Sequence, residues 1–238
     1  MKVKGGKAVY GASVGILMLE AQFPRIPGDM GNATSWPFPV HYKVVRGASP
    51  DRVVRKGAQG LLQTFITAAR ELVDDGVDGV TTNCGFLSLF QEELAAALSV
   101  PVATSSLMQV AMVNRLLAPG RRAGILTISA STLTPAHLKT AGVPDGTPIG
   151  TTEGGREFTR AILGNEIELD VEAARADNID AARALVAAHP DLGALVLECT
   201  NMVPYAADIR AATGLPVFSI ETFVRWFQSA LVPSRFEA

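Results

Sequence analysis

GVTTNCGF, at residues 79–86, and ALVLECTN, at residues 194–201, follow one pattern. In each stretch an apolar, β-prone run ends at a polar residue and a cysteine, and a helical pattern follows. Cys84 and Cys199 are the only cysteines among the 238 residues. We therefore interpret them as equivalent positions in two similar halves that share one active site, with one sulfur on each face of a substrate.

The similarity of the halves continues beyond the cysteines. Cys199 lies 115 residues after Cys84, and at this offset strand, helix and next strand align without a gap. The pairs that match include Phe90 with Tyr205, Leu94 with Ile209, Pro101 with Pro216 and Val102 with Val217. Strands that alternate with helices and are almost continuously apolar indicate parallel sheets covered on both faces. The sequence therefore predicts an α/β fold of two pseudo-symmetric parallel-sheet domains.

The predicted first domain comprises residues 1–112 and the C-terminal helix at 222–238, and the second comprises residues 113–221. We expect strands at 9–19, 40–45, 79–83, 100–104, 122–128, 147–151, 194–198 and 217–220, and helices at 57–73, 87–98, 107–117, 131–141, 179–188, 203–212 and 222–231.

The composition limits the classes of function. The chain is 48% hydrophobic and 18% charged, with a net charge of −2, which is typical of a compact protein. Its 21 Lys and Arg residues give no electrostatic basis for binding nucleic acid. No segment approaches the roughly 18 apolar residues of a membrane span, and no signal peptide is recognisable. We expect a cytoplasmic protein with reduced thiols, and no nucleic-acid or membrane partner.

Each cysteine follows a strand and precedes a predicted helix, where ligands bind in open α/β sheets. Backbone N–H groups at a helix start can hold a carboxylate and favour a thiolate, so we expect the thiol pKa to fall below its usual value of about 8.5. The predicted substrate-binding residues flank the thiols or follow the strand at 122–128. They are Asn83, Gly85, Phe86, Thr200, Asn201, Ser131 and Thr132. Ordinary helix capping is an alternative for Ser131 and Thr132.

Two opposed thiols can invert a carbon centre. One thiolate removes a proton beside a carbonyl, and the other thiol returns a proton to the opposite face, without a cofactor. Two isolated thiols are too few for a metal site, and no Cys-x-x-Cys spacing occurs. Simple core filling is the alternative for either cysteine. We predict a cofactor-independent racemase or epimerase of an amino acid or related carbon acid.

Three other residues could contact a substrate. The loop at 23–32 follows the first strand and could cover the cleft, where Arg25 would bind a carboxylate and Asp29 an amine. A solvated loop is the alternative. Glu198 could bind a substrate amine or ureido group, although its charge opposes thiolate formation, or it could point away.

The two cysteine motifs resemble those of the aspartate/glutamate racemase superfamily, which includes hydantoin racemases, maleate isomerase and arylmalonate decarboxylase. The resemblance implies two α/β domains with the site in the cleft between them, catalytic roles for Cys84 and Cys199, no cofactor, and possible homo-oligomers. Glutamate racemases typically carry Cys-Asn-Thr and Gly-Cys-Thr-His, whereas Gly85 and Phe86 follow Cys84 here and Asn201 replaces the histidine. These differences leave the identity of the substrate open, beyond its class as a small carboxylate or amide-like molecule.

The sequence is also compatible with three alternatives to a racemase. A maleate-type cis–trans isomerase would add one cysteine to a double bond and use the other as an acid. An arylmalonate-type decarboxylase is also compatible with the resemblance, although those enzymes keep one catalytic cysteine. A non-catalytic protein that binds a small ligand would use both cysteines only for packing.

Overall fold

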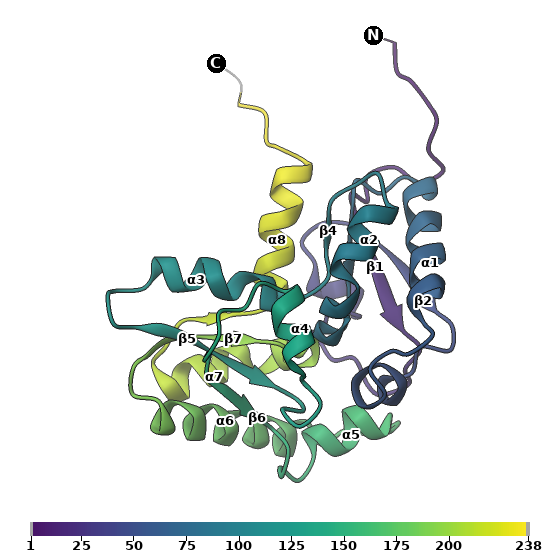
Figure 1. Cartoon of the computed structure of the whole chain (residues 1–238). Helices are drawn as coiled ribbons and strands as arrows, with labels where there is room; N and C mark the ends of the chain where they lie inside the picture. The colour runs from purple at the N-terminus through teal and green to yellow at the C-terminus, as the bar shows by residue number, and fades with distance from the viewer. Residues whose placement is uncertain (1, 237–238) are drawn as a thin grey trace.

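The computed structural model describes residues 2–236, which form two parallel four-stranded sheets (Figure 1). The strand order is β2-β1-β3-β4 in the first sheet and β6-β5-β7-β8 in the second, so the two halves have the same topology. The strands are β1 Val14–Leu19, β2 Val40–Val45, β3 Gly79–Thr82, β4 Val102–Ala103, β5 Arg122–Thr127, β6 Ile149–Thr151, β7 Leu192–Leu197 and β8 Val217–Phe218. The predicted α/β class is confirmed.

Helices connect successive strands and cover the sheets. The α-helices are α1 Leu62–Asp75, α2 Gln91–Ala97, α3 Val110–Leu116, α4 Pro135–Thr140, α5 Phe158–Gly164, α6 Val171–Ala188, α7 Ala206–Thr213 and α8 Ile220–Leu231. Short helical turns are η1 Ala33–Ser35, η2 Asp51–Arg55, η3 Gly85–Phe90, η4 Ser106–Gln109 and η5 Thr200–Tyr205. No helix among the described residues combines the length and apolar character needed to cross a membrane.

The last helix, α8, returns to the first sheet. Phe223, Val224 and Phe227 form a buried cluster with β1. A Cβ on Gly79 of β3 would lie only 2.7 Å from side-chain carbons of Phe227 and Leu231, so glycine allows α8 to approach closely. We therefore propose that α8 belongs to the first domain and that the boundaries are those expected from the sequence.

Several elements differ from the sequence prediction. The first strand begins at Val14 rather than residue 9, because Gly11 adopts a left-handed φ of 89° and interrupts the extended run. Helix α5 was not predicted, and α6 begins at Val171 rather than residue 179. The Asp170 side chain caps α6 by accepting hydrogen bonds from the N–H groups of Glu172 and Ala173. An Asp before a helical run was the signal that could have located this start.

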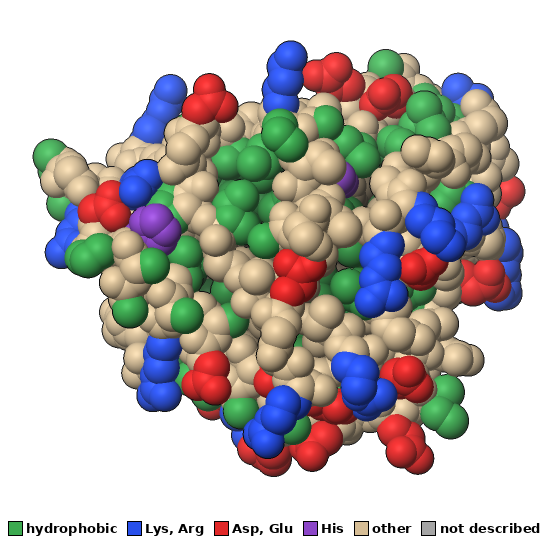
Figure 2. All heavy atoms as spheres, turned by 60° about the horizontal axis from the view of Figure 1, so that its bottom comes forward, with side chains coloured by type: hydrophobic (Ala, Val, Ile, Leu, Met, Phe, Trp, Pro, Cys, Tyr) green, Lys and Arg blue, Asp and Glu red, His purple; other side chains and the backbone are tan. Residues whose placement is uncertain are grey.

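One face of the molecule carries charges of both signs. Figure 2 shows Lys and Arg side chains interspersed with Asp and Glu around its edge, while hydrophobic side chains gather nearer its centre. Charge is therefore not segregated by sign on the face that this view presents.

Candidate active site

Cys84 and Cys199 occupy equivalent positions in the two sheets. Cys84 follows the inner strand β3 and is the residue before η3, and Cys199 follows the inner strand β7 and is the residue before η5. Both have extended backbone conformations, with φ of −149° and −75°. Both are buried, with exposed fractions of 8% and 6%. The equal topology of the halves therefore carries one thiol to the same edge of each sheet.

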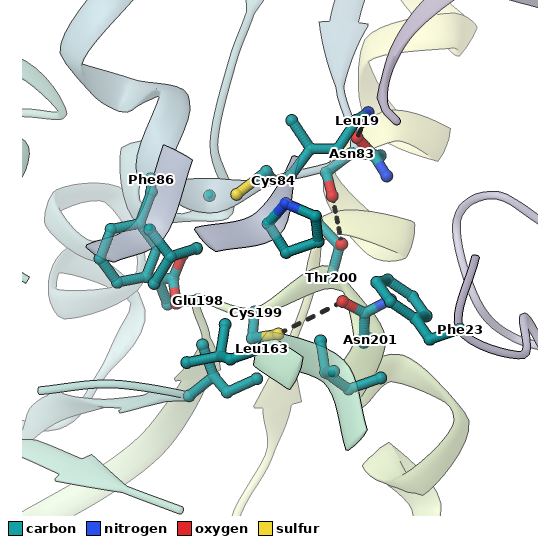
Figure 3. Close-up of a pocket in the computed structure, with 15 residues that line it drawn as sticks. Leu19, Phe23, Asn83, Cys84, Phe86, Leu163, Glu198, Cys199, Thr200 and Asn201 are labelled. Carbon is teal, nitrogen blue, oxygen red and sulfur yellow. Dashed lines mark hydrogen bonds between the residues drawn. The ribbon is translucent and has the colours of Figure 1, made fainter. Parts of the chain in front are cut away.

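Both thiols line one pocket (Figure 3). In the view of Figure 3, Cys84 and Cys199 lie on opposite sides, Glu198 and Phe86 lie to the left, and Asn201 lies to the right. The other lining residues are mostly apolar: Leu19, Phe23, Pro50, Val54, Asn83, Gly85, Ile128, Ile162, Leu163 and Thr200. A largely apolar lining with a few polar groups is typical of sites that bind small molecules.

The two halves contact each other directly beside the thiols. Thr200 Oγ1 donates a hydrogen bond of 2.6 Å to the backbone carbonyl of Asn83, and the Asn83 side chain accepts a 2.7 Å bond from the N–H of Leu19. Glu198 packs closely on Gly85. A Cβ added to Gly85 would lie 3.0 Å from Glu198 Cδ and would overlap the backbone carbonyl oxygen of Glu198. These contacts fix the distance between the two cysteine-bearing turns.

The two cysteines differ in their hydrogen bonds. Backbone N–H groups of Phe86 and Leu87 stabilise a charge on the Cys84 sulfur. The Cys199 sulfur has one such N–H group, that of Asn201, and its thiol donates to Asn201 Oδ1 at 3.7 Å. The structure therefore supports a thiolate better at Cys84 than at Cys199.

Asn201 belongs to a chain of polar contacts that starts in the loop after β1. Its Nδ2 donates to Asp29, whose other carboxylate oxygen accepts bonds from Arg25 Nη1 at 2.9 Å and the Gly31 N–H at 2.7 Å. Asp29 is 3% exposed, both its oxygens already accept hydrogen bonds, and it does not line the pocket, so its binding of a substrate amine stays a prediction. Arg25 keeps a buried Nη2 that has no partner among residues 2–236, and its guanidinium lies 4.6 Å from the ring centre of Phe23.

The expected fall in thiol pKa is wrong. Burial raises the pKa of Cys84 to about 12, and the negative charge of Glu198 adds to this increase, while the N–H groups of Phe86 and Leu87 oppose it. Burial and Glu198 also raise the pKa of Cys199 well above its ordinary value. The sequence shows that a turn follows each strand, but it does not show how completely water is excluded, and desolvation outweighs the backbone dipoles here.

Glu198 is the third ionisable group of the pocket. Burial raises its pKa to about 7, although the Thr127 hydroxyl and the Ile128 N–H lower it. It is 0% exposed and points inward rather than away. A group with this pKa exchanges its proton near neutral pH, next to both thiols.

Most predicted binding residues reach the pocket. Asn83, Gly85, Phe86, Thr200 and Asn201 line it.

Ser131 and Thr132 are not among the lining residues. Helix α4 begins later than expected because Thr134 caps it, and Ser131 instead donates hydrogen bonds to Glu153 while Thr132 donates to Ser129. We do not include either residue in the candidate site.

The sequence interpretation missed most of the apolar wall. Ile162 and Leu163 come from α5, and Pro50 and Val54 come from the segment around η2. Their spacing is that of ordinary core residues, and only the fold brings them next to the thiols.

The chain is similar in sequence to a named enzyme. A dimethylsulfoniopropionate lyase of Durusdinium sp. clade D is 30% identical over 227 residues, which cover 91% of this chain and 75% of that enzyme. No protein-family model matches the sequence.

Solved structures with the same architecture include a decarboxylase and a racemase. A mutant of arylmalonate decarboxylase in a sulfate-associated form is 19% identical, with a TM-score of 0.60 over 94% of this chain and 95% of that chain. A glutamate racemase from Bacillus anthracis is 16% identical, with a TM-score of 0.61 over 93% and 81%. At these identities the likeness shows the fold alone.

Proposed function

The chain belongs to the dimethylsulfoniopropionate lyase family within the aspartate/glutamate racemase superfamily, and on that basis we propose that it eliminates a leaving group from a small carboxylate of the dimethylsulfoniopropionate type. The superfamily expected from the two cysteine motifs is confirmed, and the chain is an enzyme. The isomerase class expected from the two thiols is not confirmed, because the named relative is a lyase.

One observation carries the proposal: a thiol from each half lines the same small, largely apolar pocket. Dimethylsulfoniopropionate has a carboxylate at one end and a dimethylsulfonium group on the second carbon from it. Its methyl groups match apolar walls such as Phe23, Ile162 and Leu163. The sulfur leaves as neutral dimethyl sulfide, so no acid is needed to assist its departure.

We assign Cys84 as the base. Its thiolate takes a proton from the carbon beside the carboxylate, and that C–H electron pair forms the new double bond. The carbon–sulfur bond breaks, and its electrons leave with dimethyl sulfide. The products are acrylate, dimethyl sulfide and the Cys84 thiol, which releases the proton before the next turnover.

The burial that makes the Cys84 thiolate rare also makes it strongly basic. The pKa of about 12 means that few molecules carry the thiolate at neutral pH. Those that do hold a base suited to a weakly acidic carbon, and the N–H groups of Phe86 and Leu87 stabilise its charge.

The test is to supply dimethylsulfoniopropionate to the purified protein and measure dimethyl sulfide by headspace gas chromatography and acrylate by NMR. We expect equal amounts of both products, and we expect Cys84→Ser to lose at least about 10³-fold in kcat/KM, as removal of a base or nucleophile commonly does. The Cys199→Ser variant is the matched comparison, and should retain more activity because elimination needs only one base. Absence of both products with the wild-type protein would refute the proposal.

The equivalent placement of the two thiols favours a second candidate, a racemase or epimerase of a small carbon acid. Racemisation needs both groups, so Cys84→Ser and Cys199→Ser would each abolish it. Incubation of D- and L-amino acids and hydantoins in D₂O would then show deuterium at one stereocentre and loss of optical rotation. The same screen, extended to maleate and arylmalonates, covers the cis–trans isomerase and the decarboxylase.

A further inference from the structure

The elimination as proposed does not use Glu198, the third ionisable group of the pocket. Its Oε2 accepts a 2.7 Å hydrogen bond from Thr127 Oγ1, which holds the side chain in place. Its Oε1 has no hydrogen-bond partner among residues 2–236. The whole residue is 0% exposed, and it lines the same cavity as Cys84 and Cys199. One carboxylate oxygen therefore has no hydrogen-bond partner, and it lies against Gly85, which lines the same pocket.

A buried carboxylate without a partner is unfavourable. Removing a charged group from water costs several kcal/mol unless a counter-charge or hydrogen bonds replace the lost hydration. No described Lys or Arg contributes to the ionisation of Glu198, on which only burial, Thr127 and Ile128 act. The protein itself therefore supplies no positive charge at this position, and a bound ligand with a cationic group would supply one.

The surroundings select the kind of cation. Phe86 lines the same pocket as Glu198, on the same side in the view of Figure 3, and most other walls of the pocket are aliphatic or aromatic. A compact ammonium ion would lose its hydration there and regain only one acceptor. A methylated onium ion spreads its charge over methyl groups that pack on apolar and aromatic surfaces while remaining attracted to the carboxylate.

We propose that Glu198 is the anchor of an onium subsite, where its free Oε1 faces the dimethylsulfonium group of the substrate. The identity of the onium group rests on the proposed function, whereas the subsite rests on the free carboxylate oxygen and its apolar surroundings. The subsite also links binding to chemistry. The charge of Glu198 opposes both thiolates, and a bound cation offsets that charge, so a cationic substrate favours the base that attacks it.

The test compares two ligands of the same shape and different charge. We would measure by calorimetry the dissociation constants of 3-(trimethylammonio)propanoate, a zwitterion whose onium group lacks the sulfur leaving group, and of 4,4-dimethylpentanoate, the carboxylate in which a neutral carbon replaces the onium nitrogen. The wild-type protein should prefer the ammonium ligand. In Glu198→Gln, which keeps the size and the acceptor for Thr127, the preference should fall at least about tenfold, equivalent to about 1.4 kcal/mol of coupling.

Glu153→Gln is the matched control, because Glu153 binds Ser129 and Ser131 outside the pocket lining. This variant loses the same unit of charge and should keep the wild-type preference. If Glu198→Gln keeps that preference as well, the onium subsite is refuted.

A second measurement needs only the wild-type protein. At pH 7, Glu198 with its pKa near 7 is about half protonated, so the bound onium ligand should expel up to about half a proton and its carbon analogue none. Calorimetry in two buffers of different ionisation enthalpy counts these protons, and equal release with both ligands would contradict the inference.

The outcomes separate the two proposals. A charge preference that depends on Glu198, without any turnover of dimethylsulfoniopropionate, keeps the subsite and rejects the lyase. Turnover without that preference keeps the lyase and rejects the subsite.

Discussion

Gly85→Ala tests whether the two halves are held together at the thiols. A Cβ at residue 85 would lie 3.0 Å from Glu198 Cδ, about 0.5 Å short of the roughly 3.5 Å at which carbon atoms pack best. It would lie closer still to Glu198 Oε1 and to the Glu198 backbone carbonyl, and the carbonyl cannot rotate away. Gly85 does not adopt a left-handed φ, so the cost comes from this contact and not from backbone strain.

Overpacking of this kind destabilises a protein by about 1–3 kcal/mol. Urea unfolding at pH 7 should therefore give a lower free energy of unfolding for Gly85→Ala. Dimethyl sulfide release should also fall, because moving Glu198 and the turn after β3 changes the separation of the thiols. A misplacement of about 1 Å at an active site can cost 10²-fold in rate.

Gly164→Ala is the matched control. Its new Cβ would lie 3.0 Å from Glu166 Oε1, the end of a flexible side chain that can move away, and Gly164 is the last residue of α5. We expect stability within about 1 kcal/mol of the wild type. If Gly85→Ala unfolds at the wild-type urea concentration and retains wild-type turnover, the close contact between the halves is refuted.

Three further changes test other parts of the site. Burial raises the pKa of Glu198 from 4.5 to about 7, so between these pH values the folded state holds a proton that the unfolded state loses. The stabilisation that this proton gives the folded state is complete below pH 4.5 and disappears as the pH rises through 7. Urea unfolding between pH 5 and pH 8 should show a loss of up to roughly 3 kcal/mol in the wild type that Glu198→Gln lacks. Thr200→Val removes the bond to the Asn83 carbonyl and leaves a buried acceptor unpaired, so unfolding at pH 7 should show a loss of about 1–3 kcal/mol. Asp29→Asn deprives the largely buried Arg25 of its counter-charge, and the same assay should show a loss of about 3 kcal/mol.

Each of these changes has a comparison. Thr213→Val removes only local bonds, to the Ile209 carbonyl and from the Leu215 N–H, and should cost less than Thr200→Val. Asp51→Asn breaks only exposed pairs, with Lys56 and Arg55, and should change stability by less than about 1 kcal/mol. Equal losses for Thr200→Val and Thr213→Val would show that the hydrogen bond between the halves has no special weight, and equal losses for Asp29→Asn and Asp51→Asn would show the same for the buried ion pair. If the free energy of unfolding of Glu198→Gln falls between pH 5 and pH 8 as much as that of the wild type, the pH dependence belongs to other groups.

The repeat was predictable from sequence because it is local and periodic. Strand, thiol and helical turn recur at a fixed offset, so the α/β class and the equivalence of Cys84 and Cys199 follow from the pattern. Asn83, Gly85, Phe86, Thr200 and Asn201 reach the pocket for the same reason, since each is within two residues of a thiol. On a tight turn, the residues next to a cysteine necessarily lie near the pocket that the thiol lines.

The tertiary structure alone decided the electrostatics and the walls of the site. The thiol pKa values depend on how much water the packing of the two halves excludes, which is a sum over many distant residues. Leu163 and Val54 look like any other core residues until α5 and η2 are brought against the thiols. The free oxygen of Glu198 is a property of packing as well, because the chain shows an acid beside a cysteine but not what surrounds it. Sequence periodicity determined which residues lie together at the strand ends. Long-range packing determined the pKa values of the thiols and of Glu198, because it determines how much water is excluded.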